Sequence, residues 1–101
     1  MSKLDQVLAH LDKNLDKAVE RLFVLLRYQS ISTDPAYKAQ CVKTAEHLKG
    51  DLGTIGFAAS VRPTKGHPVV MGQAKGGDGK KRPHFLFYGH YDVQPVDPLS
   101  L

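Results

Sequence analysis

Apolar residues recur at steps of three and four along the first quarter of the chain, which predicts one long amphipathic helix. Ser2 and Asp5 resemble a capping box at its start. Because the pattern ends near Tyr28, we expect the helix to pack against a sheet of the same chain; a coiled coil or a partner-binding helix is the alternative. The positions of this stripe are Leu4, Leu8, Leu11, Leu15, Ala18, Leu22 and Leu25.

A second helical stripe follows a short loop over residues 29–33. Asp34 and Pro35 are typical of an N-cap residue followed by proline at the first helical position. Gly56 is a natural end for this helix, and Phe57 is expected to fold back on it as a hydrophobic contact. The predicted apolar face comprises Tyr37, Cys41, Ala45, Leu48, Leu52 and Ile55.

The remaining pattern predicts strands over residues 57–62, 69–75 and 84–88. The first two are candidates for a hairpin through a turn at residues 64–68. The third contains a run of apolar and aromatic residues without a polar break, which is typical of a strand buried on both faces. Such a strand needs neighbours and a covering helix that this chain does not provide. The sequence therefore predicts an incomplete α/β domain.

The candidate chemistry lies directly after the third strand. Ligands of α/β sheets bind beyond the carboxyl ends of strands, where His90 and Asp92 fall. If the backbone stays extended after Gly89, residues two apart project to the same side, so the imidazole and the carboxylate share one small volume. A metal-binding histidine commonly donates its other ring N–H to a carboxylate. The pair is thus a candidate metal ligand with its orienting group, and a satisfied surface pair is the alternative. The prolines Pro95 and Pro98 end strand pairing beyond it.

Other potential ligands have simpler interpretations. His10 and His47 lie off the apolar stripes of their helices and are expected to be solvated. His67 lies in a turn and His84 opens the third strand. Cys41 is a lone cysteine on the apolar face of the second helix, which is typical of a small core residue. A catalytic zinc needs about three protein ligands, and these residues do not form such a set.

Composition and charge limit the classes of function that we expect for this chain. The chain has 101 residues, 42% of them hydrophobic, which is enough for one small core. Its net charge of +4 is evenly spread, with eight basic and six acidic residues in the first half and six and four in the second. We therefore expect no nucleic-acid partner. The string GGDGKKR lacks the spacing of a phosphate-binding P-loop and is expected to be a solvated hairpin loop.

The amino-terminal sequence mixes both charge signs from its third residue. It therefore has the pattern of neither a secretory signal nor a transit peptide, and no apolar run approaches the length of a membrane span. Since the chain also has a single cysteine, the cytoplasm is the expected compartment, without a membrane partner.

The string YGHYDVQPVDP resembles the first metal-binding motif of the zinc-dependent exopeptidase and deacylase family. That family includes aminoacylase, acetylornithine deacetylase, succinyl-diaminopimelate desuccinylase and many dipeptidases. The form with Tyr91 and Gln94 is similar to the dipeptidase branch. The upstream strings RYQSIS, LGTIGF and GHPVVMGQAKG also resemble the opening of the family, so the similarity spans nearly the whole chain.

This resemblance implies that residues 1–101 are the amino-terminal portion of a di-zinc peptidase catalytic domain, built on a helix-covered mixed sheet. His90 would bind one of two Zn²⁺ ions, and Asp92 would be the catalytic residue that orients it. The bridging carboxylate, the glutamate base and the remaining ligands of the family have no counterpart here.

As a full-length protein, we expect a homodimeric enzyme that hydrolyses dipeptides or small peptides by metal-activated water. The 101 residues alone are expected to be inactive. Deacylation of N-acyl amino acids is one alternative, and a noncatalytic truncated or interaction module is another.

Overall fold

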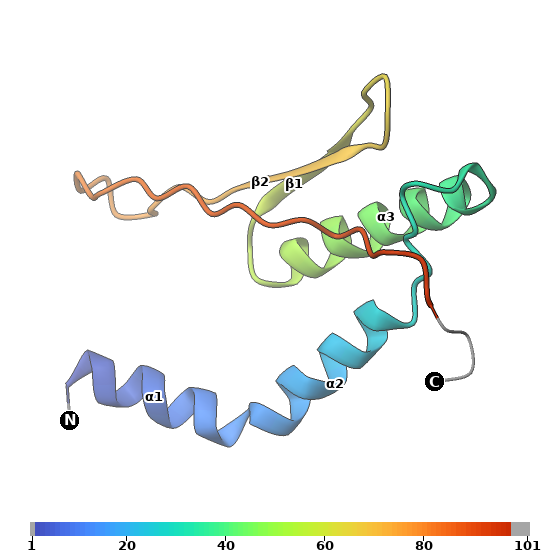
Figure 1. Cartoon of the computed structure of the whole chain (residues 1–101). Helices are drawn as coiled ribbons and strands as arrows, with labels where there is room; N and C mark the ends of the chain where they lie inside the picture. Colours follow the sequence, from blue (N-terminus) through green and yellow to red (C-terminus); the bar gives the residue numbers. More distant parts are fainter. Residues whose placement is uncertain (1, 98–101) are drawn as a thin grey trace.

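The computed structural model describes residues 2–97, which contain helices, one two-stranded sheet and long connecting segments without regular secondary structure (Figure 1). Pro98 therefore lies outside the described residues. The mixture of helix and sheet confirms the predicted α/β class. The elements are α1 (Lys3–Lys13), α2 (Leu15–Leu26), the 3-10 turn η1 (Pro35–Tyr37), α3 (Lys38–Thr54), β1 (Ala58–Arg62) and β2 (Val69–Gln73).

The first helical stripe forms two helices, so the prediction of a single uninterrupted helix is wrong. The break lies at Asn14, where φ is −108° and ψ is 12°. The Asn14 side-chain amide donates to the His10 carbonyl oxygen at 2.8 Å. Asparagine disfavours a helix interior because its side chain competes for such backbone groups. The capping box is confirmed, since the Ser2 hydroxyl and the Asp5 carboxylate each accept the other residue's backbone N–H at 3.1 Å.

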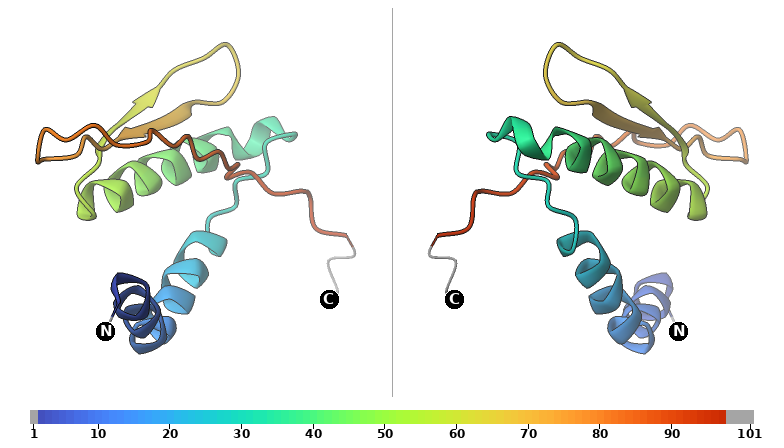
Figure 2. Two further views of the ribbon diagram at one scale, coloured as in Figure 1. Left: turned by 90° about the vertical axis from the view of Figure 1, so that its left-hand side faces the viewer. Right: turned by 90° about the vertical axis from the view of Figure 1, so that its right-hand side faces the viewer.

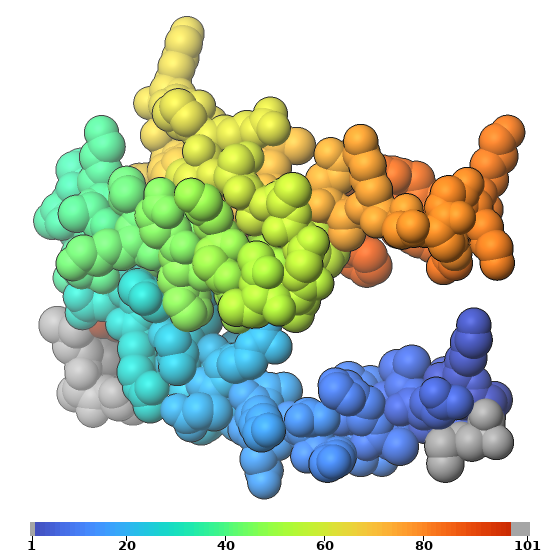
Figure 3. Space-filling view, turned by 180° about the vertical axis from the view of Figure 1, so that it is seen from behind, coloured from blue at the N-terminus to red at the C-terminus, as the bar shows by residue number. Residues whose placement is uncertain are grey.

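Helix α1 lies away from the sheet, contrary to the prediction that its stripe packs there. Every residue of α1 is exposed, and Leu4 and Leu11 keep 66% and 58% of their surface accessible. Figure 3 shows open space between α1 and the loop around residues 76–82. Helix α2 does approach α3, because Arg21 Nη2 lies 2.7 Å from Asp51 Oδ2.

Helix α3 supplies most of the buried residues. Cys41 and Ala45 are fully buried, as predicted. Thr44 is also fully buried, and its hydroxyl is satisfied by donating to the Gln40 carbonyl oxygen at 2.7 Å. The predicted core position Ile55 is instead 63% exposed, because it caps the helix beyond the last turn.

The end of α3 follows the predicted glycine stop. Gly56 has φ of +90°, and its N–H donates to the Gly53 carbonyl oxygen at 3.1 Å. The Phe57 N–H donates to the Leu52 carbonyl oxygen at 3.1 Å, which completes a Schellman motif. The side chains of Leu52 and Phe57 both lie against Gly72 of β2, where an added Cβ would be 3.0 Å from Leu52 Cδ1 and 3.3 Å from Phe57 Cδ1. The helix end thereby fixes how α3 sits on the hairpin.

Strands β1 and β2 form the predicted antiparallel hairpin. Ala58 pairs with Gln73 at one end and Arg62 pairs with Val69 at the other, and α3 packs against both strands. The turn between them is held by Thr64, whose hydroxyl donates to the His67 carbonyl oxygen at 2.6 Å. The loop after β2 is exposed over residues 76–82, as expected, and Asp78 pairs with Arg82 within it.

Residues 84–88 do not form the buried strand that the sequence predicts. The segment lacks strand pairing, and Phe85, Leu86, Phe87 and Tyr88 are 74%, 91%, 90% and 91% exposed. The apolar run would need a hydrogen-bonded neighbour to be buried, and within residues 2–97 none pairs with it. The chain instead continues past α3 towards the loop after α2, as both views of Figure 2 show.

Among residues 2–97, no helix combines the length and the hydropathy needed to cross a bilayer.

Candidate functional site

The candidate site lies where the chain after Gly89 crosses the loop that follows α2. Ile31 and Val93 form an isolated parallel bridge, and the Val93 N–H donates to the Ser30 carbonyl oxygen at 3.0 Å. The Ser30 hydroxyl donates to the Tyr91 carbonyl oxygen at 2.7 Å, and Ser30 is 2% exposed. Two segments about 60 residues apart are therefore tied together by backbone and hydroxyl groups at the predicted motif.

His90 and Asp92 lie on the same side of this segment, as the sequence predicts. His90 Nδ1 is 2.8 Å from Asp92 Oδ1, and the His90 side chain is 73% exposed. An ionised carboxylate only accepts hydrogen bonds, so Nδ1 carries the hydrogen of the neutral ring. The Nε2 lone pair is then directed away from the aspartate and is available to a metal ion.

The Asp92 carboxylate is held in its ionised form by two neighbours. The Ser32 hydroxyl donates to Asp92 Oδ2 at 2.7 Å, and this contact, followed by the one from His90, lowers the pKa of Asp92. Hydrogen bonds to the charged form of a carboxyl group favour that form. Each carboxylate oxygen therefore has one donor, and the group acts as an acceptor at both oxygens.

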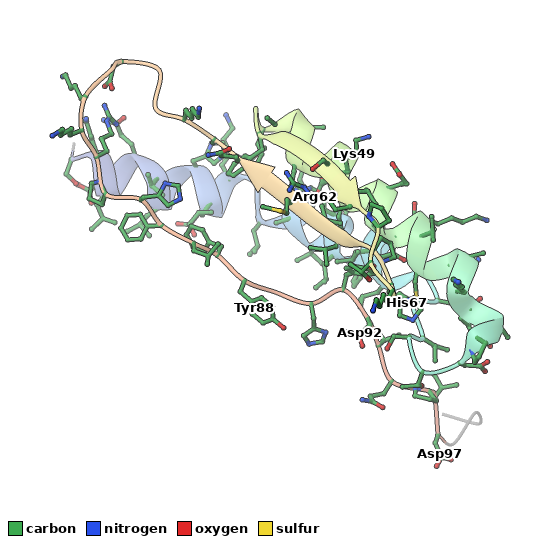
Figure 4. The ribbon with its side chains drawn as sticks, turned by 90° about the horizontal axis from the view of Figure 1, so that it is seen from above. Lys49, Arg62, His67, Tyr88, Asp92 and Asp97 are labelled. Carbon is green, nitrogen blue, oxygen red and sulfur yellow. The ribbon has the colours of Figure 1, made fainter. Side chains whose placement is uncertain are left out.

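The turn of the hairpin closes the site from a third direction, and Figure 4 shows His67 and Asp92 close together there. His67 Nε2 lies 2.7 Å from the Ser32 carbonyl oxygen, so Nε2 is the donor. The Tyr91 hydroxyl donates to the Pro68 carbonyl oxygen at 2.6 Å, and burial raises the pKa of this phenol. Loop, turn and motif thus meet at one point.

A cleft of about 750 Å³ borders the His90–Asp92 pair. Its walls come from α3, β2 and residues 87–92, and Cys41, Leu48 and Val70 give it an apolar lining. Burial raises the pKa of the Cys41 thiol, with a further contribution from the charge of Asp92. Cys41 therefore stays protonated at neutral pH and is a core residue, as predicted, rather than a nucleophile.

One imidazole fits the role of a metal ligand here. Within the range 2–97, however, no three His, Cys, Asp or Glu side chains come together as a metal-binding group. His10 is exposed on α1, and Asp97 lies well away from Asp92 in Figure 4. His47 was expected to be solvated but is half-buried, with its ring centroid 5.1 Å from that of Tyr28. His90 thus provides a single ligand position.

Sequence reasoning missed three residues that shape the site: Ser30, Ser32 and His67. The alternation Ser-Ile-Ser was a usable signal, because residues two apart in an extended segment face the same neighbour. Nothing in the local sequence, however, pairs this loop with residues 91–93. That pairing depends on the tertiary fold.

The chain is similar to two Cys-Gly metallodipeptidases. It is 29% identical to dug1 of Schizosaccharomyces pombe over 116 aligned residues, covering 97% of this chain and 24% of the relative. It is 32% identical to DUG1 of Candida albicans over 93 residues, covering 79% of this chain and 19% of the relative. The chain thus spans about a quarter or less of the length of these curated relatives. No family model and no solved structure matches it.

Proposed function

We propose that this chain is the amino-terminal part of the catalytic domain of a metal-dependent dipeptidase. In this proposal His90 binds one metal ion through Nε2, and Asp92 orients the His90 ring. The observation that carries it is the 2.8 Å contact between His90 Nδ1 and Asp92 Oδ1, which leaves the other ring nitrogen free. The similarity to two metallodipeptidases supports a metal-dependent hydrolase.

Zinc is the metal that we propose. Imidazole and carboxylate donors suit Zn²⁺, and the HYDVQP motif resembles that of zinc-dependent dipeptidases. A zinc ion bound there would supply Lewis acidity and lower the pKa of a water molecule. His90 contributes one neutral ligand, and Asp92 fixes its tautomer and makes Nε2 more basic. We propose a two-zinc centre in the complete protein.

The proposed substrates are dipeptides. Both relatives are named for Cys-Gly dipeptide hydrolysis, and the cleft of about 750 Å³ beside the pair is within the size range of small-molecule sites. Deacylation of N-acyl amino acids is the alternative within the same family. Homodimeric assembly of the complete protein stays a prediction, as does the cytoplasmic location, which the lone buried thiol of Cys41 supports.

A noncatalytic interaction module is the competing proposal, and the exposed apolar stripe of α1 favours it. Leu4, Leu8 and Leu11 remain 66%, 48% and 58% accessible, so the stripe is free to bind another helix or sheet. Metal content distinguishes the two proposals, because an interaction module is not expected to bind a metal ion through Nε2 of His90.

The test is His90→Ala in the complete protein, with bound metal counted by mass spectrometry of the native protein. We expect the variant to lose one of two zinc ions and its dipeptide hydrolysis, because a ligand is removed. The matched control is His10→Ala, which removes an exposed imidazole on α1 and should keep both ions and full activity. Retention of two zinc ions in His90→Ala would contradict the proposal.

A further inference from the structure

The Asp92 carboxylate bridges two side chains that come from different parts of the chain. Its Oδ1 lies 2.8 Å from His90 Nδ1, two residues away, and its Oδ2 accepts from the Ser32 hydroxyl at 2.7 Å, 60 residues away. With only the local contact, the carboxylate could rotate about its Cβ–Cγ bond, since such terminal torsions have broad minima. The second, distant donor is therefore what defines the plane of the carboxylate.

Ser32 is itself held in place from both sides. Its carbonyl oxygen lies 2.7 Å from His67 Nε2 in the hairpin turn, and the residue before it, Ile31, pairs with Val93. Ser32 is half-buried, so water competes less for its hydroxyl than at an open surface. Because the turn, the loop and the backbone bridge fix the position of Ser32, its hydroxyl is suited to orient the side chain that accepts from it.

We propose that Ser32 is a positioning residue: its hydroxyl orients the Asp92 carboxylate and so keeps His90 in the Nδ1–H tautomer, with Nε2 free for a ligand. This inference rests on the proposed function in one respect: the proposed function explains why Nε2 has to stay free, namely to bind a metal ion. The contacts that carry it are present without metal or substrate. Ser32 lines the cleft together with His90 and Asp92, and the role proposed for its hydroxyl is exerted through the Asp92 carboxylate.

The neighbouring hydroxyls show that this role belongs to Ser32. Ser30 is almost fully buried, and its side-chain hydroxyl donates to the Tyr91 carbonyl oxygen and not to the Asp92 carboxylate. Thr33 is exposed, and among the hydrogen bonds of the described residues its hydroxyl has no contact with Asp92. Removing the Thr33 hydroxyl is therefore a matched control for removing that of Ser32.

The test is the tautomer of His90 in the metal-free 101-residue protein, read from ¹⁵N chemical shifts at about pH 8, where an ordinary histidine is neutral. We expect Ser32→Ala to move His90 towards the Nε2–H tautomer, because the carboxylate no longer has a fixed orientation. Ser32→Thr, which keeps the hydroxyl, should restore the original tautomer, and Thr33→Ala should leave it unchanged. Circular dichroism checks that each variant keeps its helices.

A His90 tautomer that is the same in folded Ser32→Ala as in Thr33→Ala would overturn the inference. If Ser32→Ala loses its helical signal, Ser32→Cys takes its place, since a thiol fills the same position but is a weak donor. An unchanged tautomer in folded Ser32→Cys would also count against the role of Ser32. This outcome is independent of the test of the proposed function. A shifted tautomer in a protein that binds no zinc would support the positioning role of Ser32 and contradict the proposed metallopeptidase function.

Discussion

At the scale of single residues, the site combines local contacts with distant ones: His90 Nδ1 lies 2.8 Å from Asp92 Oδ1 and 3.2 Å from the Asp92 carbonyl oxygen. His90 and Asp92 meet because they are two positions apart in extended backbone. The hydrogen bond from Ser32 is the main cause of the lowered pKa of Asp92, and no local sequence pattern connects these two residues. Burial has the opposite effect on Cys41 and Tyr91, whose pKa values it raises. The same small region therefore keeps one group charged and two groups neutral.

The amino-terminal capping box gives a pH-dependent prediction at this scale. The Ser2 hydroxyl, followed by the Ser2 backbone N–H, lowers the pKa of Asp5 below its ordinary value. Since the folded value is the lower one, the stabilisation of α1 is fully present above the ordinary pKa of about 3.9 and is lost as pH falls through the folded value. The helical signal of α1 should decrease over that acid range.

Carboxyl ¹³C titration of Asp5 checks this prediction. Ser2→Ala should raise the pKa of Asp5, whereas Ser2→Thr should keep it low because threonine also caps helices. An Asp5 titration that is identical in Ser2→Ala and the unchanged chain would show that the cap does not form in solution.

At the scale of elements, the ends of the helices were more predictable than their packing. Asp34 acts as a cap as predicted, since it accepts the Ala36 N–H at 2.9 Å, but it caps the 3-10 turn η1. Helix α3 begins only at Lys38 and has no side-chain cap. Gly56 ends α3 in the left-handed conformation that its lack of a Cβ permits. The break at Asn14 was missed because the apolar stripe continues across it without a change of period.

Two glycines of the α3 region should respond oppositely to alanine. Gly56→Ala should lower the free energy of unfolding by about 1–2 kcal/mol, because a Cβ is strained at a φ of +90°. Gly50→Ala should raise it by up to about 1 kcal/mol, since Gly50 is inside the helix and nothing lies within 4 Å of an added Cβ. Urea denaturation of the two variants checks both signs. Equal effects would contradict the C-cap geometry of Gly56.

At the scale of the whole molecule, the buried core of the described residues is small. Ser30, Ile31, Cys41, Thr44 and Ala45 are buried, and they gather where the loop after α2 meets α3. Helix α1 and residues 84–88 lie outside this core with their apolar side chains exposed. Stability should therefore be unevenly distributed along the chain.

Hydrogen exchange measures that distribution. We expect the slowest backbone amides in the middle of α3 and in the β1–β2 hairpin, which pack on each other. Amides of α1 should exchange almost as fast as in an unfolded peptide, because an 11-residue helix without tertiary packing is marginal in water. Protection of α1 equal to that of α3 would mean that its apolar stripe is covered in solution.

The sequence by itself determined the features that depend on neighbours along the chain. Residue spacing predicted the α3 face at Cys41 and Ala45, the glycine stop at Gly56, the β1–β2 hairpin and the contact between His90 and Asp92. Each of these follows from backbone geometry over a few residues.

Only the tertiary structure decided which distant segments meet. It placed Ser32 and His67 beside the predicted motif, and within residues 2–97 it left the apolar side chains of α1 and of residues 84–88 exposed. An apolar pattern shows that a surface can be buried, but burial requires a partner at the right place in space. Long-range contacts such as that of Ser32 with Asp92 join positions 60 residues apart, and local periodicity carries no information about them.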